Sequence, residues 1–164
     1  MSDTAQRWST GRLACAAAGL MLVLGGCASS SAAPSSSVSG FRSALAAATP
    51  QLRVLRDDLD SELLSARGLT SSQLAQRSYT LATAAQHNLN TVSSLLAPTR
   101  YNTRLRALRS SLGALVYDLS NVSTAAGNRN APALAEALKT VRTDAVSVTG
   151  TDATLSRALG LSPS

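Results

Sequence analysis

Apolar residues recur at spacings of three and four along most of the chain after residue 40, and this periodicity restricts the fold more than any other feature. The clearest run begins at Tyr101 and ends before Gly127 and Asn128, residue types that commonly terminate helices. Its apolar positions are Tyr101, Leu105, Leu108, Leu112, Leu115, Leu119, Val122 and Ala126. Alternating steps of four and three place these side chains on one face of an α-helix. The pattern therefore predicts an amphipathic helix over about residues 101–126.

A similar face precedes this run, over residues 41–68. Its apolar positions are Phe41, Leu45, Ala48, Leu52, Leu55, Leu59, Leu63 and Ala66, and it ends at Gly68. Thr49-Pro50 interrupts the stretch with a helix-start signal, because proline suits the first helical turn. The phase continues across Pro50, so the sequence predicts either one kinked helix or a short helix followed by a longer one.

Two more stretches have the same periodicity. One opens with Thr70-Ser71-Ser72-Gln73, which has the form of a capping box, and closes at Ala97-Pro98. Its face consists of Leu74, Ser78, Leu81, Ala85, Leu89, Val92 and Leu96. The other begins near Asn130-Ala131-Pro132, weakens at Gly150 and Asp152, and has a second apolar segment beyond them. Its face consists of Leu134, Leu138, Val141, Ala145 and Val148, then Leu155 and Leu159.

No segment of comparable length alternates strictly between apolar and polar residues, so the sequence does not favour strands. Four amphipathic helices with short connections fit an all-α fold, an up-down-up-down four-helix bundle. We predict this bundle over residues 41–160, with a disordered tail over 161–164. About 120 residues are enough to bury one core.

The first 26 residues have the pattern of an export signal. A polar segment that carries Arg7 and Arg12 precedes an apolar run from Leu13 to Leu24, and small residues follow. The apolar run holds about 12 residues, whereas a membrane-spanning helix needs about 20. We therefore predict a signal peptide over residues 1–26 and no permanent transmembrane anchor in this segment.

The end of this signal, Leu24-Gly25-Gly26-Cys27, resembles the lipobox of bacterial lipoproteins, in which leucine and two small residues precede a cysteine. The resemblance covers only the signal segment. It implies that a diacylglycerol is attached to the thiol of Cys27 and that cleavage then makes Cys27 the first residue of the mature chain. Ordinary signal cleavage after Ala28 is the alternative, because Gly26-Cys27-Ala28 also fits a small-x-small site. Cys15 lies in the apolar run and would be removed by either cleavage.

Residues 27–40 contain mostly serine and alanine with single proline and glycine residues, and they show no periodicity. Such a composition cannot bury enough apolar surface to fold. We predict a flexible tether between the lipidated cysteine and the bundle. The expected location is the outer side of the cell membrane, reached through the lipid on Cys27.

The charges of the predicted bundle form two clusters. Asp57, Asp58, Asp60 and Glu62 lie late in the first helical stretch, and Arg100, Arg104, Arg106 and Arg109 open the third. An up-down-up-down order places these arginines and Arg42 at the end that carries the tether, and the acidic cluster at the other end beside Arg67. The five arginines are thus candidates for contact with an anionic surface such as lipid headgroups. The alternative is that they are solvated or paired with nearby carboxylates.

The motifs of catalytic and cofactor sites are missing from the sequence. The single histidine, His87, has Tyr79 two helical turns away, which allows a haem or metal site, but an ordinary exposed histidine is the simpler interpretation. No Gly-x-Ser-x-Gly motif, metal-ligand spacing or glycine-rich phosphate loop occurs. The aromatic content of 3% is low for stacking on nucleic acid. We therefore expect no enzymatic activity, no cofactor, no metal and no nucleic-acid partner.

Two functions remain after these exclusions. The favoured one is a lipid-anchored envelope protein that acts as an interaction or structural module, with anionic headgroups or another envelope protein as its partner. The alternative is a carrier that holds a small apolar ligand, a lipid or haem, in the core of the bundle.

Overall fold

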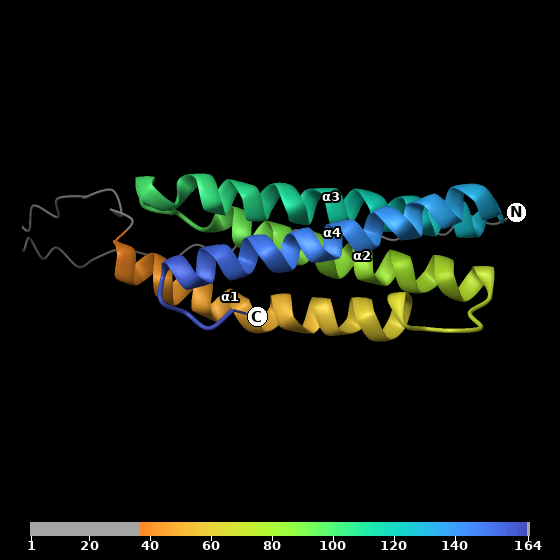
Figure 1. Ribbon diagram of the computed structural model, residues 1–164, viewed down its shortest axis with the longest axis horizontal. Helices are drawn as coiled ribbons and strands as arrows, with labels where there is room; N and C mark the ends of the chain where they lie inside the picture. The colour runs from red at the N-terminus through yellow and green to blue at the C-terminus, as the bar shows by residue number, and fades with distance from the viewer. Residues whose placement is uncertain (1–36, 164) are drawn as a thin grey trace, which may run out of the picture. The chain divides into compact units, whose positions relative to one another are not determined.

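A computed structural model describes residues 37–163, and these residues form a helical bundle without strands (Figure 1). The elements are α1 (Val38–Asp58), the π-helix η1 (Leu59–Leu64), α2 (Ser71–Ser94), the short 3₁₀ helix η2 (Thr99–Tyr101), α3 (Asn102–Gly127) and α4 (Ala131–Ala158). Successive long helices run in opposite directions in Figure 1. The predicted all-α class is confirmed.

Side-chain caps explain where three of the helices begin. Thr70 Oγ1 accepts from Gln73 N at 3.2 Å and Gln73 Oε1 accepts from Thr70 N at 2.9 Å, which is the predicted capping box. Asn130 Oδ1 accepts from Ala133 N at 3.2 Å before α4. Ser37 Oγ accepts from Gly40 N at 3.0 Å, so α1 begins at Val38, inside the segment predicted as tether. The capping serine is the reason for this earlier start.

The sequence suggested that two helices could be interrupted, one at Pro50 and one at Gly150 and Asp152, and neither helix is. α1 is one helix that contains Pro50, which excludes a division into two helices at that residue. α4 is likewise continuous through Gly150 and Asp152. The seam of α3 is buried as predicted, and the side chains of Leu108, Leu112 and Leu115 are inaccessible to solvent.

The first helical stretch ends in a wide turn that the sequence did not predict. η1 continues α1, and Ser65 N donates to Asp60 O at 2.8 Å, a bond that spans five residues. A π-turn accommodates one more residue than an α-turn. Leu55, Leu59 and Leu63 are all buried, so the core face continues from α1 into η1.

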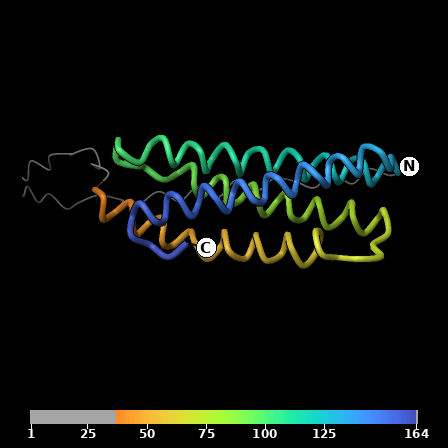
Figure 2. Tube along the Cα trace, in the orientation of Figure 1, coloured from red at the N-terminus to blue at the C-terminus, as the bar shows by residue number. Residues whose placement is uncertain are grey.

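The helices differ in how closely they pack. α3 packs closely along α2 and α4, whereas α1 stands farther from its neighbours. In Figure 2, the end of α4 lies beside the start of α1. The core face of α1 consists largely of leucine, whereas that of α2 includes Ser78, Ala82 and Ala85. Because interaxial distance follows the size of the side chains at the contact, these small residues let α2 lie close to α3.

Candidate functional site: the basic end and the grooves beside α1

We call the end of the bundle where α1 and α3 begin and α2 and α4 end the basic end. Two aromatic rings and one arginine join three helices there. The ring centroids of Phe41 and Tyr101 lie 5.8 Å apart, and Tyr101 Oη donates to Ala158 O at 3.5 Å. Arg42 Nη2 donates to Gly160 O at 3.1 Å. The ring of Tyr101 is buried as predicted, and its hydroxyl bonds to the end of α4.

The positive charge of the described residues is concentrated at this end. Six arginines lie within about 20 Å of it, measured along the helices at about 1.5 Å per residue. They are Arg42, Arg100, Arg104, Arg106, Arg109 and Arg157. The acidic residue of the described chain at this level is Asp152, which is 1% exposed. The rest of the described chain carries seven basic and seven acidic residues, so it is neutral as a whole.

Two of these arginines bind the carbonyl ends of neighbouring helices. Arg42 of α1 reaches the turn after α4, as described above. Arg109 of α3 donates to the end of α2: its Nε to Val92 O at 3.3 Å, and its Nη2 to Ser93 O at 3.0 Å and Leu95 O at 2.8 Å. Guanidinium groups there satisfy carbonyls that lack helical partners and oppose the negative ends of the helix dipoles. Both side chains therefore have a structural role.

The other three predicted arginines are oriented toward solvent. Arg100 lies over the ring of Tyr101, with its Cζ 4.8 Å from the ring centroid. Arg104 and Arg106 are exposed, and neither makes a hydrogen bond or ion pair with another described residue. Arg100 in η2 and Arg104 in the first turn of α3 are four residues apart in the sequence, whereas Arg106 lies on the opposite flank of α3 from Arg104. The guanidinium groups of Arg100 and Arg104 are thus the available pair.

Exposed apolar residues accompany these charges. Leu96 is 64% exposed in the connection between α2 and α3, and Val38 is 37% exposed at the start of α1. The sequence placed Leu96 on the apolar face of the second helix. However, α2 ends at Ser94, so Leu96 leaves the helical phase and is exposed in the connection to α3.

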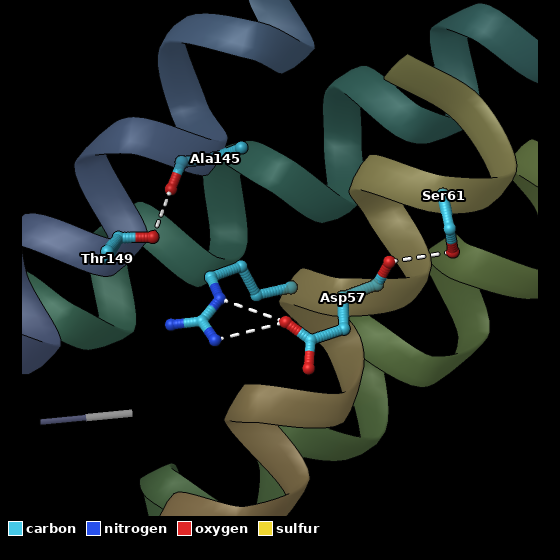
Figure 3. A network of polar contacts seen from close by, with 5 residues as sticks. Asp57, Ser61, Ala145 and Thr149 are labelled. Carbon is cyan, nitrogen blue, oxygen red and sulfur yellow. Dashed lines mark hydrogen bonds and ion pairs between the residues drawn. The ribbon is translucent and has the colours of Figure 1, made fainter. Parts of the chain in front are cut away.

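A groove separates α1 and η1 from α4, with a volume of about 990 Å³. Its walls include Leu59 and Leu64 on one side and Ala145, Val146 and Gly150 on the other. Figure 3 shows polar contacts near this groove: Thr149 Oγ1 donates to Ala145 O at 3.0 Å, and Ser61 Oγ donates to Asp57 O at 2.8 Å. Each of these contacts joins residues on the same side of the groove, whereas Arg142 Nη2 of α4 donates across it to Leu64 O of η1 at 3.5 Å.

A second groove, of about 750 Å³, lies between α1 and α2. Val54, Tyr79 and His87 line it, so the histidine and tyrosine singled out in the sequence face the same space. His87 is exposed. Within residues 37–163, no group of three or more histidine, cysteine, aspartate and glutamate side chains is arranged to hold a metal ion.

The acidic cluster lies toward the end opposite the basic end, and its members interact locally. Asp57 Oδ1 accepts from Arg56 Nη2 at 3.0 Å, and Asp60 Oδ1 accepts from Ser65 Oγ at 3.0 Å. Arg67 follows the cluster in the connection to α2.

A pair of carboxyl groups between α3 and α4 was not predicted. Asp118 Oδ1 accepts from Asn121 Nδ2 at 3.2 Å, whereas Asp144 Oδ2 is buried without a hydrogen-bond partner among the described residues. Burial of the carboxyl, its hydrogen-bonding contact with Asp118 and the charge of Asp118 together raise the pKa of Asp144 to about 6. If both groups are ionised, no proton is available between them. If Asp144 is protonated, it can donate to Asp118.

Asp152 is a buried carboxylate that the sequence could have revealed. It occupies a core position of α4, one step of four after Val148 and one step of three before Leu155. Ser156 Oγ lies 3.5 Å from its Oδ1. The weakening of the apolar pattern at this residue was therefore the signal of a polar side chain in the core, not of a break in the helix.

Comparisons with known proteins give no match: neither a family model nor a curated protein nor a solved structure resembles the chain at a significant level. Cys27, the predicted lipidation residue, lies outside the described residues. None of the helices between residues 37 and 163 combines the length and the apolar character that crossing a bilayer requires.

Proposed function

We propose that this chain is a bacterial lipoprotein, anchored through a lipid on Cys27 to the outer side of the cell membrane, whose up-down-up-down four-helix bundle acts as a non-enzymatic interaction or structural module. The lipobox-like segment Leu24-Gly25-Gly26-Cys27 carries this proposal. Lipidation needs a thiol nucleophile after small residues, and this segment provides both.

The start of α1 is compatible with such an anchor. Ten residues, Cys27 to Ser36, precede the capping residue Ser37. Fully extended, they span at most about 35 Å. As a flexible chain, they would have a root-mean-square reach of roughly 17 Å. The basic end, where α1 begins, would therefore lie close to the lipid surface.

The proposal is tested by replacing Cys27 with serine and following fatty-acid incorporation and membrane fractionation in a bacterial host. The native chain should incorporate labelled palmitate and sediment with membranes, whereas Cys27→Ser should do neither. Cys15→Ser is the matched control, because it removes the other thiol, and it should behave like the native chain. Unchanged membrane attachment of Cys27→Ser, with no fatty acid on either form, would refute the anchor.

The interaction role is tested separately, by crosslinking the native chain in the envelope and identifying the captured proteins by mass spectrometry. Specific neighbours captured by the native chain should be lost when the surface of the bundle is substituted. An enzymatic activity that disappears with the chain and returns with the purified protein would overturn the non-enzymatic role.

A carrier of a small apolar ligand is the second candidate. The two grooves beside α1 favour it, because their walls are largely apolar and α1 is the least closely packed helix. Native mass spectrometry of the purified protein distinguishes the two functions. A carrier should retain a lipid or haem as additional mass, and the bare mass of the chain after mild extraction would argue against it.

A further inference from the structure

We propose that the basic end binds an anionic phospholipid bilayer, with Leu96 entering the interfacial region and Arg100 and Arg104 contacting lipid phosphates. The proposal rests on the anchored location proposed above, and it names the partner of that end of the bundle. Three separate observations at the basic end support it: the excess of positive charge, arginines without a carboxylate partner, and exposed apolar side chains.

The charge distribution provides the first argument. The basic end contains six arginines and one carboxylate, that of Asp152, which is buried. The rest of the described chain is neutral. Electrostatic attraction to an anionic leaflet decays within about 10 Å at moderate salt. An anionic surface would therefore attract this end and not the opposite one.

The availability of individual arginines provides the second argument. Arg42 and Arg109 donate to helix-terminal carbonyls, so their guanidinium groups are held against neighbouring helices. Arg100 in η2, which lies over the ring of Tyr101, and Arg104 in the first turn of α3 are both exposed, and neither pairs with a carboxylate of the described residues. Guanidinium groups bind phosphate through paired hydrogen bonds, so such a pair fits a headgroup surface.

Leu96 provides the third argument. It is 64% exposed in the short connection between α2 and α3, directly before the arginine pair. An exposed leucine next to basic side chains is favoured at a membrane interface, where apolar side chains insert beside cationic ones. Val38, at the entry of the chain into α1, adds a second exposed apolar side chain at this end.

The test uses the anchored protein with a single fluorescent reporter. An environment-sensitive dye is attached at Leu96→Cys, or at Val146→Cys as the matched control, because Val146 is 73% exposed on the side of α4. Each protein is reconstituted into vesicles of phosphatidylcholine alone or of equal parts phosphatidylcholine and phosphatidylglycerol. The dye at position 96 should shift to the blue only in anionic vesicles and should return on addition of salt. The dye at position 146 should not shift.

Substitutions then assign the contact. Arg100→Gln with Arg104→Gln should lower the population of the bound orientation on the order of 30-fold and abolish the shift at position 96. The control pair is Arg53→Gln with Arg67→Gln, which removes the same charge farther from the basic end and should leave the shift unchanged. Circular dichroism should confirm that all these variants stay helical, because each replaced side chain is exposed.

Three outcomes decide the proposal. No shift at position 96 in anionic vesicles would overturn it. A shift in native envelope membranes that disappears in vesicles of their extracted lipids would also overturn it, in favour of an envelope protein as partner. If the chain carries no lipid, flotation with anionic vesicles that depends on Arg100 and Arg104 would still support the bilayer contact, although the proposed anchor would have failed.

Discussion

Replacing Asp144 with asparagine should stabilise the bundle near pH 8 and leave its stability unchanged near pH 4. The carboxyl of Asp144 lies between α3 and α4 close to Asp118, with one buried oxygen that lacks a partner. Asparagine is neutral at every pH, and its amide can donate to the Asp118 carboxylate as a protonated aspartic acid would. The substitution therefore keeps this side chain uncharged at every pH, which is the form that the folded protein favours.

The sign follows from the raised pKa. Asp144 has a pKa of about 6 in the folded chain, against about 3.9 for an unperturbed aspartate. The folded state binds more protons than the unfolded state between about pH 4 and pH 6, so native stability falls as the pH rises through this window. For a fully buried group the loss would be about 3 kcal/mol. Because Asp144 is only partly buried, solvent screening reduces it to about 1 kcal/mol.

Thermal and urea unfolding of the native chain and Asp144→Asn at the two pH values measure this difference. Near pH 8 the variant should be more stable by about 1 kcal/mol, or roughly 4 °C in melting temperature. Glu136→Gln is the matched control, since it removes a carboxylate from the exposed side of the same helix and should not stabilise. A stability gain of equal size at both pH values, or destabilisation near pH 8, would refute the reasoning.

Three further substitutions test how individual residues hold the helices. Arg109→Ala removes three hydrogen bonds to the end of α2 and should lower the free energy of unfolding in urea by about 1–2 kcal/mol; an effect no larger than that of Arg104→Ala would contradict the capping role. Gly113→Ala should raise the melting temperature, worth about 0.5–1 kcal/mol, because a Cβ there meets open space inside α3, whereas Gly68→Ala should lower it because Gly68 has φ +71°. Pro50→Ala restores a backbone donor within α1 and should stabilise by between about 1 and 3 kcal/mol; an unchanged melting temperature would mean that the helix already accommodates the proline.

Local signals predicted the helices well. The capping box at Thr70 and the leucine seam of α3 depend on neighbours three or four residues away, and both occur as expected. In α2, by contrast, Ala82 and Asn88 are buried in addition to the predicted Ser78, and Leu96 is exposed. Hydrophobicity alone misplaces such a face, because small and polar side chains are buried where helices approach closely.

Features that depend on the register between helices could not be predicted. The meeting of Asp118 with Asp144 requires α3 and α4 to align at particular levels, and nothing local in either helix encodes that alignment. The bonds from Arg42 to the end of α4 and from Arg109 to the end of α2 likewise join residues of different helices. From the sequence, these arginines could not be distinguished from Arg100 and Arg104, whose side chains remain available.

The wide turn of η1 has a consequence for how this fold tolerates changes in length. An extra residue in a regular helix rotates every later side chain by about 100°, which would carry Leu63 out of the core. In this chain the π-turn confines that rotation to Leu59–Leu64. Removing one residue at Asp60 or Ser61 should convert the segment to an ordinary α-turn while the leucines on both sides keep their places. The same deletion near Leu52, where the helix has regular α-turns, should rotate the rest of α1 so that its leucines no longer point toward the core.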